Sequence, residues 1–151
     1  MDTAAGGSIQ SAARIILNGG VYAGSGTFNR TVGTTAGQIN WGTAAGGFAA
    51  YGGDLIVDLG ALGVNDSFTW GSGSFIGGNF LLSSDIATGK VTFRDNIDLG
   101  TNNRTVSVAD NPNSTADMAE ISGNITGARL LSKTGAGKLI LSGNNTHTLG
   151  T

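Results

Sequence analysis

The residues in this chain that could do chemistry include a lysine placed after two glycines. The segment TGAGKL, residues 134–139, has this arrangement. A phosphate-binding loop requires the pattern G-x-x-x-x-G-K-[ST], in which backbone N–H groups and the lysine hold the phosphates. Here Ser132 stands where the first glycine is needed, and Leu139 follows Lys138 where a hydroxyl residue is needed. The sequence therefore predicts a glycine corner at this point rather than a nucleotide site.

A second candidate is the acidic segment GGDLIVDLG, residues 52–60. It partly follows the calcium nonapeptide G-G-x-G-x-D-x-U-x, whose sites are shared between stacked turns of tandem copies. The third glycine is missing, Val57 occupies the aspartate position, and there is no second copy. We therefore expect a strand with Asp54 and Asp58 facing solvent, and no metal site.

Paired carboxylates are a third candidate, because glycoside hydrolysis needs two of them facing one cleft. The pairs to consider are Asp95 with Asp98 and Asp110 with Asp117. Most of these aspartates occur in turn sequences, where the side chain commonly bonds to its own backbone. With Glu120 as the one glutamate, the sequence predicts no catalytic residues and no enzyme activity.

The remaining candidates are a histidine, several asparagines and the aromatic residues. His147 has no serine or carboxylate near it in the sequence, which favours a packing or surface role. Aromatic residues could stack on sugars, but their strand positions favour the core for most, with Tyr22 and Tyr51 as the exceptions. Asparagines at successive corners could instead stack into ladders. Six Asn-x-Ser/Thr triplets fit this corner role better than glycosylation: Asn29, Asn65, Asn103, Asn113, Asn124 and Asn144.

The composition excludes several classes of protein. The 8 lysines and arginines are scattered and the net charge is −2, so nucleic acid is not an expected partner. The absence of cysteine rules out disulfides and thiolate chemistry. No apolar run approaches the length of a membrane span. Residues 1–8 do not have the pattern of a signal peptide, and DTAAGGS (2–8) does not read as a capping element.

The elements that would position these residues are short strands. Glycine is abundant (27 residues) and proline is rare (1 residue), and the apolar runs alternate with polar residues at a period of two. Such runs, separated by turn clusters, are compatible with a sandwich, a barrel or a β-solenoid. Expected strands are 13–17, 27–32, 54–59, 67–70, 90–94, 104–108 and 138–142.

The last segment favours the solenoid. Leu131, Lys133, Gly135, Gly137, Leu139, Leu141, Gly143 and Asn145 all lie on one parity, so one register continues through the glycine turn. A solenoid chain bends at a corner while the same face stays inward. We therefore expect Leu139 and Leu141 to be buried, Lys133 to mark the corner, and Gly135 or Gly137 to adopt a positive φ.

These residues also carry a family resemblance. LSKTGAGKLILSGNNTHTLGT, residues 131–151, resembles the autotransporter-associated β-strand repeat of bacterial surface proteins, with the pattern L-x-K-x-G-x-G-x-L-x-L-x-G-x-N-x-Y-x-G-x-T. It departs at His147, where the family has tyrosine, and at Leu149, where it has glycine. More loosely, residues 91–127 resemble the segment that precedes this repeat. The resemblance implies a right-handed parallel β-helix with structural repeats and no catalytic residues or cofactor.

The sequence thus predicts one uncapped β-solenoid segment over residues 1–151. Its expected role is structural: a stalk, adhesin or fibre module that is extracellular or on a bacterial cell surface. The expected partner is another copy, stacked head to tail into filaments, because open strand ends invite pairing. A side face could also contact cell-surface or matrix polysaccharide. The alternatives are a carbohydrate-binding or polysaccharide-cleaving β-helix, and a Greek-key sandwich used as a binding module.

Overall fold

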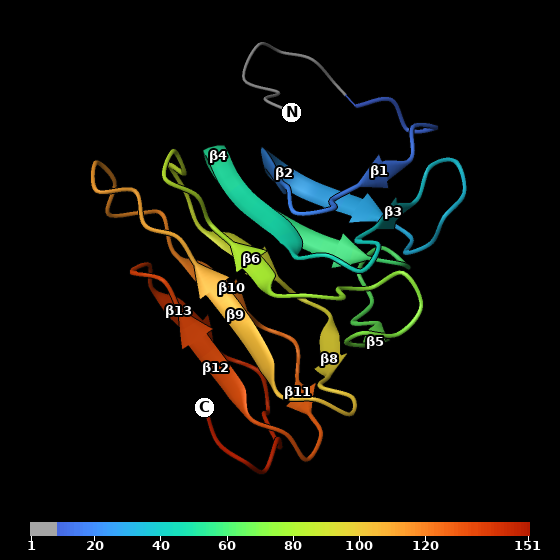
Figure 1. Ribbon diagram of the computed structural model, residues 1–151. Helices are drawn as coiled ribbons and strands as arrows, with labels where there is room; N and C mark the ends of the chain where they lie inside the picture. Colours follow the sequence, from blue (N-terminus) through green and yellow to red (C-terminus); the bar gives the residue numbers. More distant parts are fainter. Residues whose placement is uncertain (1–8) are drawn as a thin grey trace.

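The computed structural model describes residues 9–151, and it is all β within that range (Figure 1). The expectations for residues 1–8, including the absence of a cap, lie outside the described residues. No helix in the described range is long and apolar enough to cross a membrane. The strands are β1 (Ile15–Ile16), β2 (Val21–Arg30), β3 (Ile39–Asn40), β4 (Gly46–Leu59), β5 (Ser67–Thr69), β6 (Phe80–Leu82), β7 (Val91–Phe93), β8 (Asn96–Asp98), β9 (Arg104–Val108), β10 (Ala119–Ile121), β11 (Ile125–Thr126), β12 (Leu131–Thr134) and β13 (Leu139–Leu141).

The strands are stacked as coils of a β-solenoid of about 4 turns, which confirms the predicted fold class. Every pairing between named strands in residues 9–151 is parallel. Figure 1 shows the coils following one another in sequence order, from β2 and β4 at the top to β12 and β13 at the bottom. Neither a Greek-key sandwich nor an antiparallel barrel has this pairing.

Each coil contributes strands to successive faces of the solenoid. One face carries the first half of β2 and of β4, followed by β6, β9 and β12. The next carries the second half of β2 and of β4, followed by β7, β10 and β13. The third consists of β5, β8 and β11. Contacts between neighbouring coils join residues 36 apart at Asp58 and Arg94, but only 20 apart at Asn124 and Asn144, so the last coil is the shortest.

The long strand β4 serves two faces because it bends in its middle. Gly52 and Gly53 have φ values of 76° and 144°, which side-chain-bearing residues rarely adopt. Beside this bend, the register between β2 and β4 shifts between Gly24 and Gly26. The sequence prediction for this region, 54–59, found only the second half of the strand. The first half contains the small residues Gly46, Gly47, Ala49 and Ala50, which gave no clear alternation.

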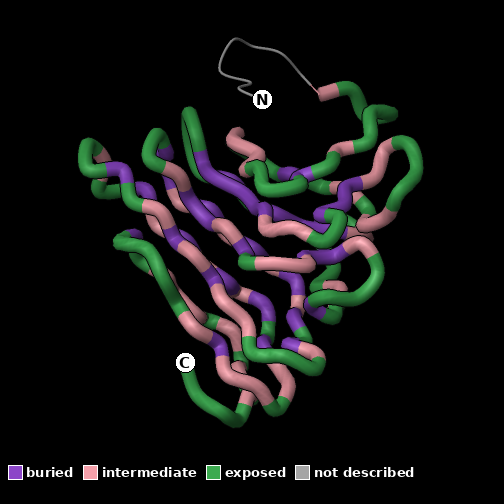
Figure 2. The backbone as a smooth tube through the Cα atoms, in the orientation of Figure 1, coloured by how far each residue is buried: buried purple, intermediate pink, exposed green. Residues whose placement is uncertain are grey.

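The core is a continuous apolar column inside the coils, visible as the buried segments along many of the strands in Figure 2. Aromatic rings fill its first part, with ring centroids 5.2 Å apart for Phe28 and Phe48, and 5.1 Å apart for Phe80 and Phe93. Aliphatic residues such as Val106 and Ile121 fill the later coils. Stability in such a column comes from neighbouring coils in sum.

The last coil keeps the predicted alternation, but its inward-facing side chains are only half-buried. Residues 141, 143, 145 and 147 are half-buried, whereas 142, 144, 146 and 148 are exposed. The expectation that Leu139 and Leu141 are buried needs correction, because both are half-buried and pack against the edge of the core. In this structure no further coil lies over them. β12 and β13 stand at the two ends of the strand order of the eight-stranded sheet.

Candidate functional site

The segment TGAGKL forms a corner, as predicted. Gly135 has a φ of 80°, and the Nζ of Lys133 donates a hydrogen bond of 2.6 Å to its carbonyl oxygen. The N–H of Gly137 donates to the carbonyl oxygen of Val108 in the preceding coil, at 3.0 Å. The backbone of this turn therefore binds the coil beneath it, and Lys133 closes the corner.

The acidic segment 52–60 differs from its prediction at one of its two aspartates. Asp54 is exposed, as expected, and its Oδ1 accepts the N–H of Lys90 at 2.8 Å. Asp58 was expected to face solvent, but its exposed fraction is 0%. The alternation that would place it outside breaks at the end of β4, where Val57, Asp58 and Leu59 are all buried. Within residues 9–151, no cluster of three histidine, cysteine or acidic side chains could hold a metal ion.

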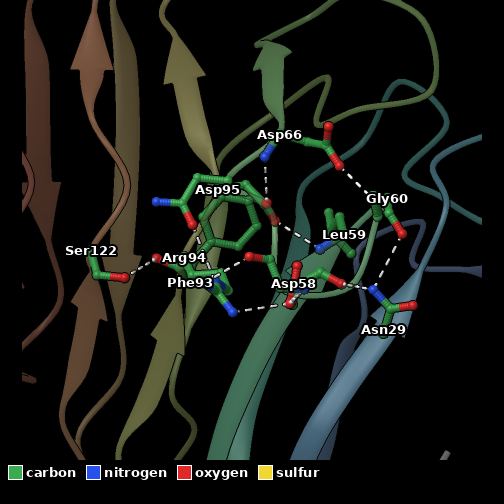
Figure 3. Close-up of polar contacts among 12 residues, drawn as sticks. Asn29, Asp58, Leu59, Gly60, Asp66, Phe93, Arg94, Asp95 and Ser122 are labelled. Carbon is green, nitrogen blue, oxygen red and sulfur yellow. Dashed lines mark hydrogen bonds and ion pairs between the residues drawn. The ribbon is translucent and has the colours of Figure 1, made fainter.

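Asp58 is stabilised by an arginine from the next coil (Figure 3). Its Oδ2 lies 3.2 Å from a terminal guanidinium nitrogen of Arg94 and also accepts the N–H of Gly63 at 2.7 Å. The Arg94 side chain is 33% exposed, so its cation lies at the boundary between the core and the solvent. The other carboxylate oxygen, Oδ1, is buried and has no hydrogen-bond partner in the described structure. The ion pair therefore compensates the burial of this charge only in part.

A second buried carboxylate, that of Asp95, lies beside this pair in Figure 3. Its Oδ2 accepts the N–H of Leu59 at 2.7 Å, and its Oδ1 accepts the N–H of Asp66 at 3.1 Å. Burial raises the pKa of Asp95 to about 7, and the neighbouring Asp58 carboxylate adds to the rise, although the two backbone donors oppose it. Asp95 thus satisfies backbone donors at the start and end of the loop between β4 and β5.

The predicted carboxylate pairs are not those that the structure brings together. Asp95 points inward while Asp98 is exposed, with its Oδ1 accepting the N–H of Gly100 at 2.6 Å. Asp110 is exposed, whereas Asp117 is buried and accepts the N–H of Asn111 at 2.6 Å. The close pair is instead Asp58 and Asp95, from successive coils, and both are fully buried. Both carboxylates hold the corner in place by accepting hydrogen bonds from backbone N–H groups.

Asparagines at one corner join neighbouring coils, through side-chain bonds to the backbone rather than through the stacked side chains that the sequence suggested. The Nδ2 of Asn96 donates to the carbonyl oxygen of Asn65 at 3.0 Å, and its Oδ1 accepts the N–H of Asn124 at 2.8 Å. The Oδ1 of Asn124 then accepts the N–H of Asn144 at 2.8 Å. Side chains aligned at one corner therefore carry hydrogen bonds from coil to coil.

The aromatic residues mostly belong to the core, as expected. Trp41 and Trp70 are buried. Tyr22 was expected to be an exception, but it packs against the core with its ring centroid 4.6 Å from that of Phe28. Tyr51 is 38% exposed at the bend of β4. A ring nitrogen of His147 lies 2.7 Å from the hydroxyl of Thr151, a contact within the last coil.

Sequence reasoning missed the Asp58–Arg94 pair and the capping role of Asp95. The available signal was weak: Asp95 directly follows Arg94 at the end of one apolar run, and Asp58 is the next-to-last residue of the earlier run 54–59. In comparisons with known proteins, no family model, no curated protein and no solved structure matches this chain.

Proposed function

We propose that this chain is a structural repeat module of a bacterial extracellular or cell-surface stalk, adhesin or fibre, without enzyme activity. Copies stack head to tail, with the last coil of one subunit on the first coil of the next. The mechanism is mechanical, because each added coil extends a column held by backbone pairing and apolar contact.

The observation that carries this proposal is the edge of the last coil. β12 pairs with β9 and β13 pairs with β10, each with a named strand on one side only among the described residues. On the free side of β12, the N–H of Leu131 donates to the carbonyl oxygen of Gly150 at 3.1 Å, so the open part of this edge begins after Leu131.

In a parallel pair, successive residues of a strand direct their N–H and C=O groups to opposite sides of the strand. Because Arg104 donates its N–H to the carbonyl of Leu130, that alternation directs Ser132 toward β9 and Lys133 toward the open edge. Such an edge is a template for another strand.

The likeness of residues 131–151 to the autotransporter-associated β-strand repeat supports the location and class. The pattern positions are occupied by Leu131, Lys133, Gly135, Leu139 and Leu141. Lys133 and Gly135 form the corner, and the three leucines lie in the core or pack against it. The proposal follows from stacking geometry and from this pattern together.

The test is a variant that blocks the edge without touching an existing ladder. Lys133→Pro removes one N–H from the open edge and leaves the pairing of β12 with β9 in place. Lys133→Ala is the matched control, because it removes the same side chain but keeps the N–H. We expect Lys133→Pro to shorten or abolish filaments seen by electron microscopy, and Lys133→Ala to retain them. Equal filament formation by the two variants would contradict assembly through this edge.

A further inference from the structure

A hollow of about 550 Å³ lies on the side of the solenoid. It is lined by corners of three successive coils, including Thr43, Ser72 and Thr101. Its volume is in the range of small-molecule sites. The buried Asp58 and Asp95 take no part in it.

Arg104, the first residue of β9, supplies the positive charge of this hollow. Its Nε donates to the carbonyl oxygen of Leu99 at 2.8 Å, and one terminal nitrogen donates to the carbonyl oxygen of Trp70. Its Cζ lies 5.7 Å from the centroid of the Trp70 ring. These contacts hold the guanidinium in place but use only two of its five N–H donors.

No carboxylate pairs with Arg104 in residues 9–151, where the ion pairs involve Lys90 and Arg94. Partial burial lowers the pKa of Arg104. An arginine held by carbonyl oxygens and lacking an acidic partner is prepared to bind a carboxylate through its free donors.

Glycines keep the space around this guanidinium open. A Cβ at Gly71 would lie 2.7 Å from a terminal nitrogen of Arg104, and a Cβ at Gly100 would lie 3.3 Å from the same nitrogen. Gly73, also on the wall, has no atom within 4 Å of its ideal Cβ position. Thr43, Thr69 and Ser72 line the same hollow, and their hydroxyls make no hydrogen bond within the described residues.

We propose that this hollow binds an acidic saccharide, with its carboxylate on Arg104 and its ring hydroxyls on the threonine and serine hydroxyls. The hollow is larger than a bare anion needs, and its free hydrogen-bonding groups surround the cation. This binding goes beyond the proposed assembly and does not depend on it. A uronic acid unit of a polysaccharide has the required carboxylate and hydroxyls.

The experiment is calorimetric titration of the full chain with three probes: a galacturonic acid oligosaccharide, the uncharged galactose oligosaccharide of equal length, and inorganic sulfate. We expect the acidic oligosaccharide to bind, and the uncharged one to bind about tenfold or more weakly. Sulfate should bind far more weakly than the acidic oligosaccharide. Equal affinity for the two oligosaccharides, equal affinity for sulfate, or no binding at all would each overturn the proposal.

Variants then locate the site. Arg104→Gln should abolish binding, but it also removes structural hydrogen bonds, so a second variant is needed. Gly73→Asp places a competing carboxylate on the wall at a φ of 59°, which aspartate and asparagine tolerate. It should weaken binding about tenfold or more, while Gly73→Asn weakens it less. Gly26→Asp, at a similarly open position outside the hollow, controls for net charge and should bind normally. Equal binding by Gly73→Asp and Gly26→Asp, with both folded, would overturn the assignment.

Discussion

Arg94 reaches across the boundary between two coils and lies 3.2 Å from the buried carboxylate of Asp58, a residue 36 positions earlier. The pair joins the end of β7 to the end of β4, where the solenoid turns its corner. Removal of one partner from a buried pair leaves an uncompensated charge, which costs more than the pair itself contributes. This contact is therefore a sensitive point of the stack.

Substitution of Arg94 should destabilise the fold strongly. Arg94→Met leaves Asp58 buried with the N–H of Gly63 as its remaining partner, and we expect a loss of about 3 kcal/mol in the free energy of unfolding. Lys90→Met is the matched control, because Lys90 pairs with Glu120 at a more exposed site and should cost about 0–1 kcal/mol. Denaturant unfolding measures both. A cost for Arg94→Met no larger than that of Lys90→Met would contradict this role.

Asp95 should make stability depend on pH. Its pKa is raised from 3.8 to about 7 in the folded state, so the folded state binds this proton more tightly than the unfolded state does. The free energy of unfolding should therefore fall as the pH rises from about 4 to about 7, and this dependence should level off above that range. Asp95→Asn should flatten the profile between these values.

Glu120 should affect the pH dependence of stability in the opposite direction to Asp95. Its pKa is held below the ordinary 4.5, chiefly by the hydrogen bond from Lys90 and then by that from Ser142. Its contribution is present above the unfolded pKa and is lost as the pH falls through the lower folded value. Glu120→Gln should therefore lower the free energy of unfolding above about pH 4.5 and remove the decline at more acidic pH, without changing the slope that Asp95 causes. If Asp95→Asn leaves the decline between pH 4 and 7 intact, another group must cause it.

Glycine at the corners should matter through close approach as well as through φ. A Cβ at Gly137 would collide with the carbonyl oxygen of Ala109 in the preceding coil, although Gly137 has no positive φ. Gly63 has a φ of 83° but open space around it. Gly137→Ala should therefore lower the thermal midpoint more than Gly63→Ala, whose cost is about 1 kcal/mol. The combined Gly135→Val and Gly137→Val variant should fail to fold, and a reversed order of the two alanine variants would contradict the collision.

The core should weaken toward the last coil. Leu82 is fully buried in β6, so Leu82→Ala should cost about 2–5 kcal/mol. Leu141 is half-buried in β13, so Leu141→Ala should cost less, below about 2 kcal/mol, because less apolar area is lost. Denaturant unfolding of the two variants compares them directly. An unchanged midpoint for Leu141→Ala would show that its side chain does not face the core.

The solenoid was predictable because its signals are local. Alternation in 104–108 marked β9 to the residue, and the single parity of residues 131–145 predicted a register that continues through a corner at Lys133 and Gly135. The two-residue strands β3 and β11 are too short to show a period. They form because strands of neighbouring coils pair with them, and a local sequence pattern carries no information about that pairing.

The buried carboxylates were not predictable for the same reason. In sequence, Asp58 looks like a solvent-facing strand residue and Asp95 like an ordinary turn residue, and their burial depends on which residues lie in the adjacent coil. Arg94 stacks over Asp58 because residues 36 apart face each other at that corner, whereas in the last coil residues 20 apart do. The sequence alone does not reveal these separations. Unequal coils remove the fixed period that would have aligned these positions.

The central claim, head-to-tail stacking, is tested most directly by sedimentation of the unmodified chain over a range of concentrations at low and moderate salt. We predict particles that lengthen with concentration and change little with salt, because backbone pairing and apolar contact would drive the growth rather than charge. A strictly monomeric particle at the highest concentration, in both salts, would contradict the account.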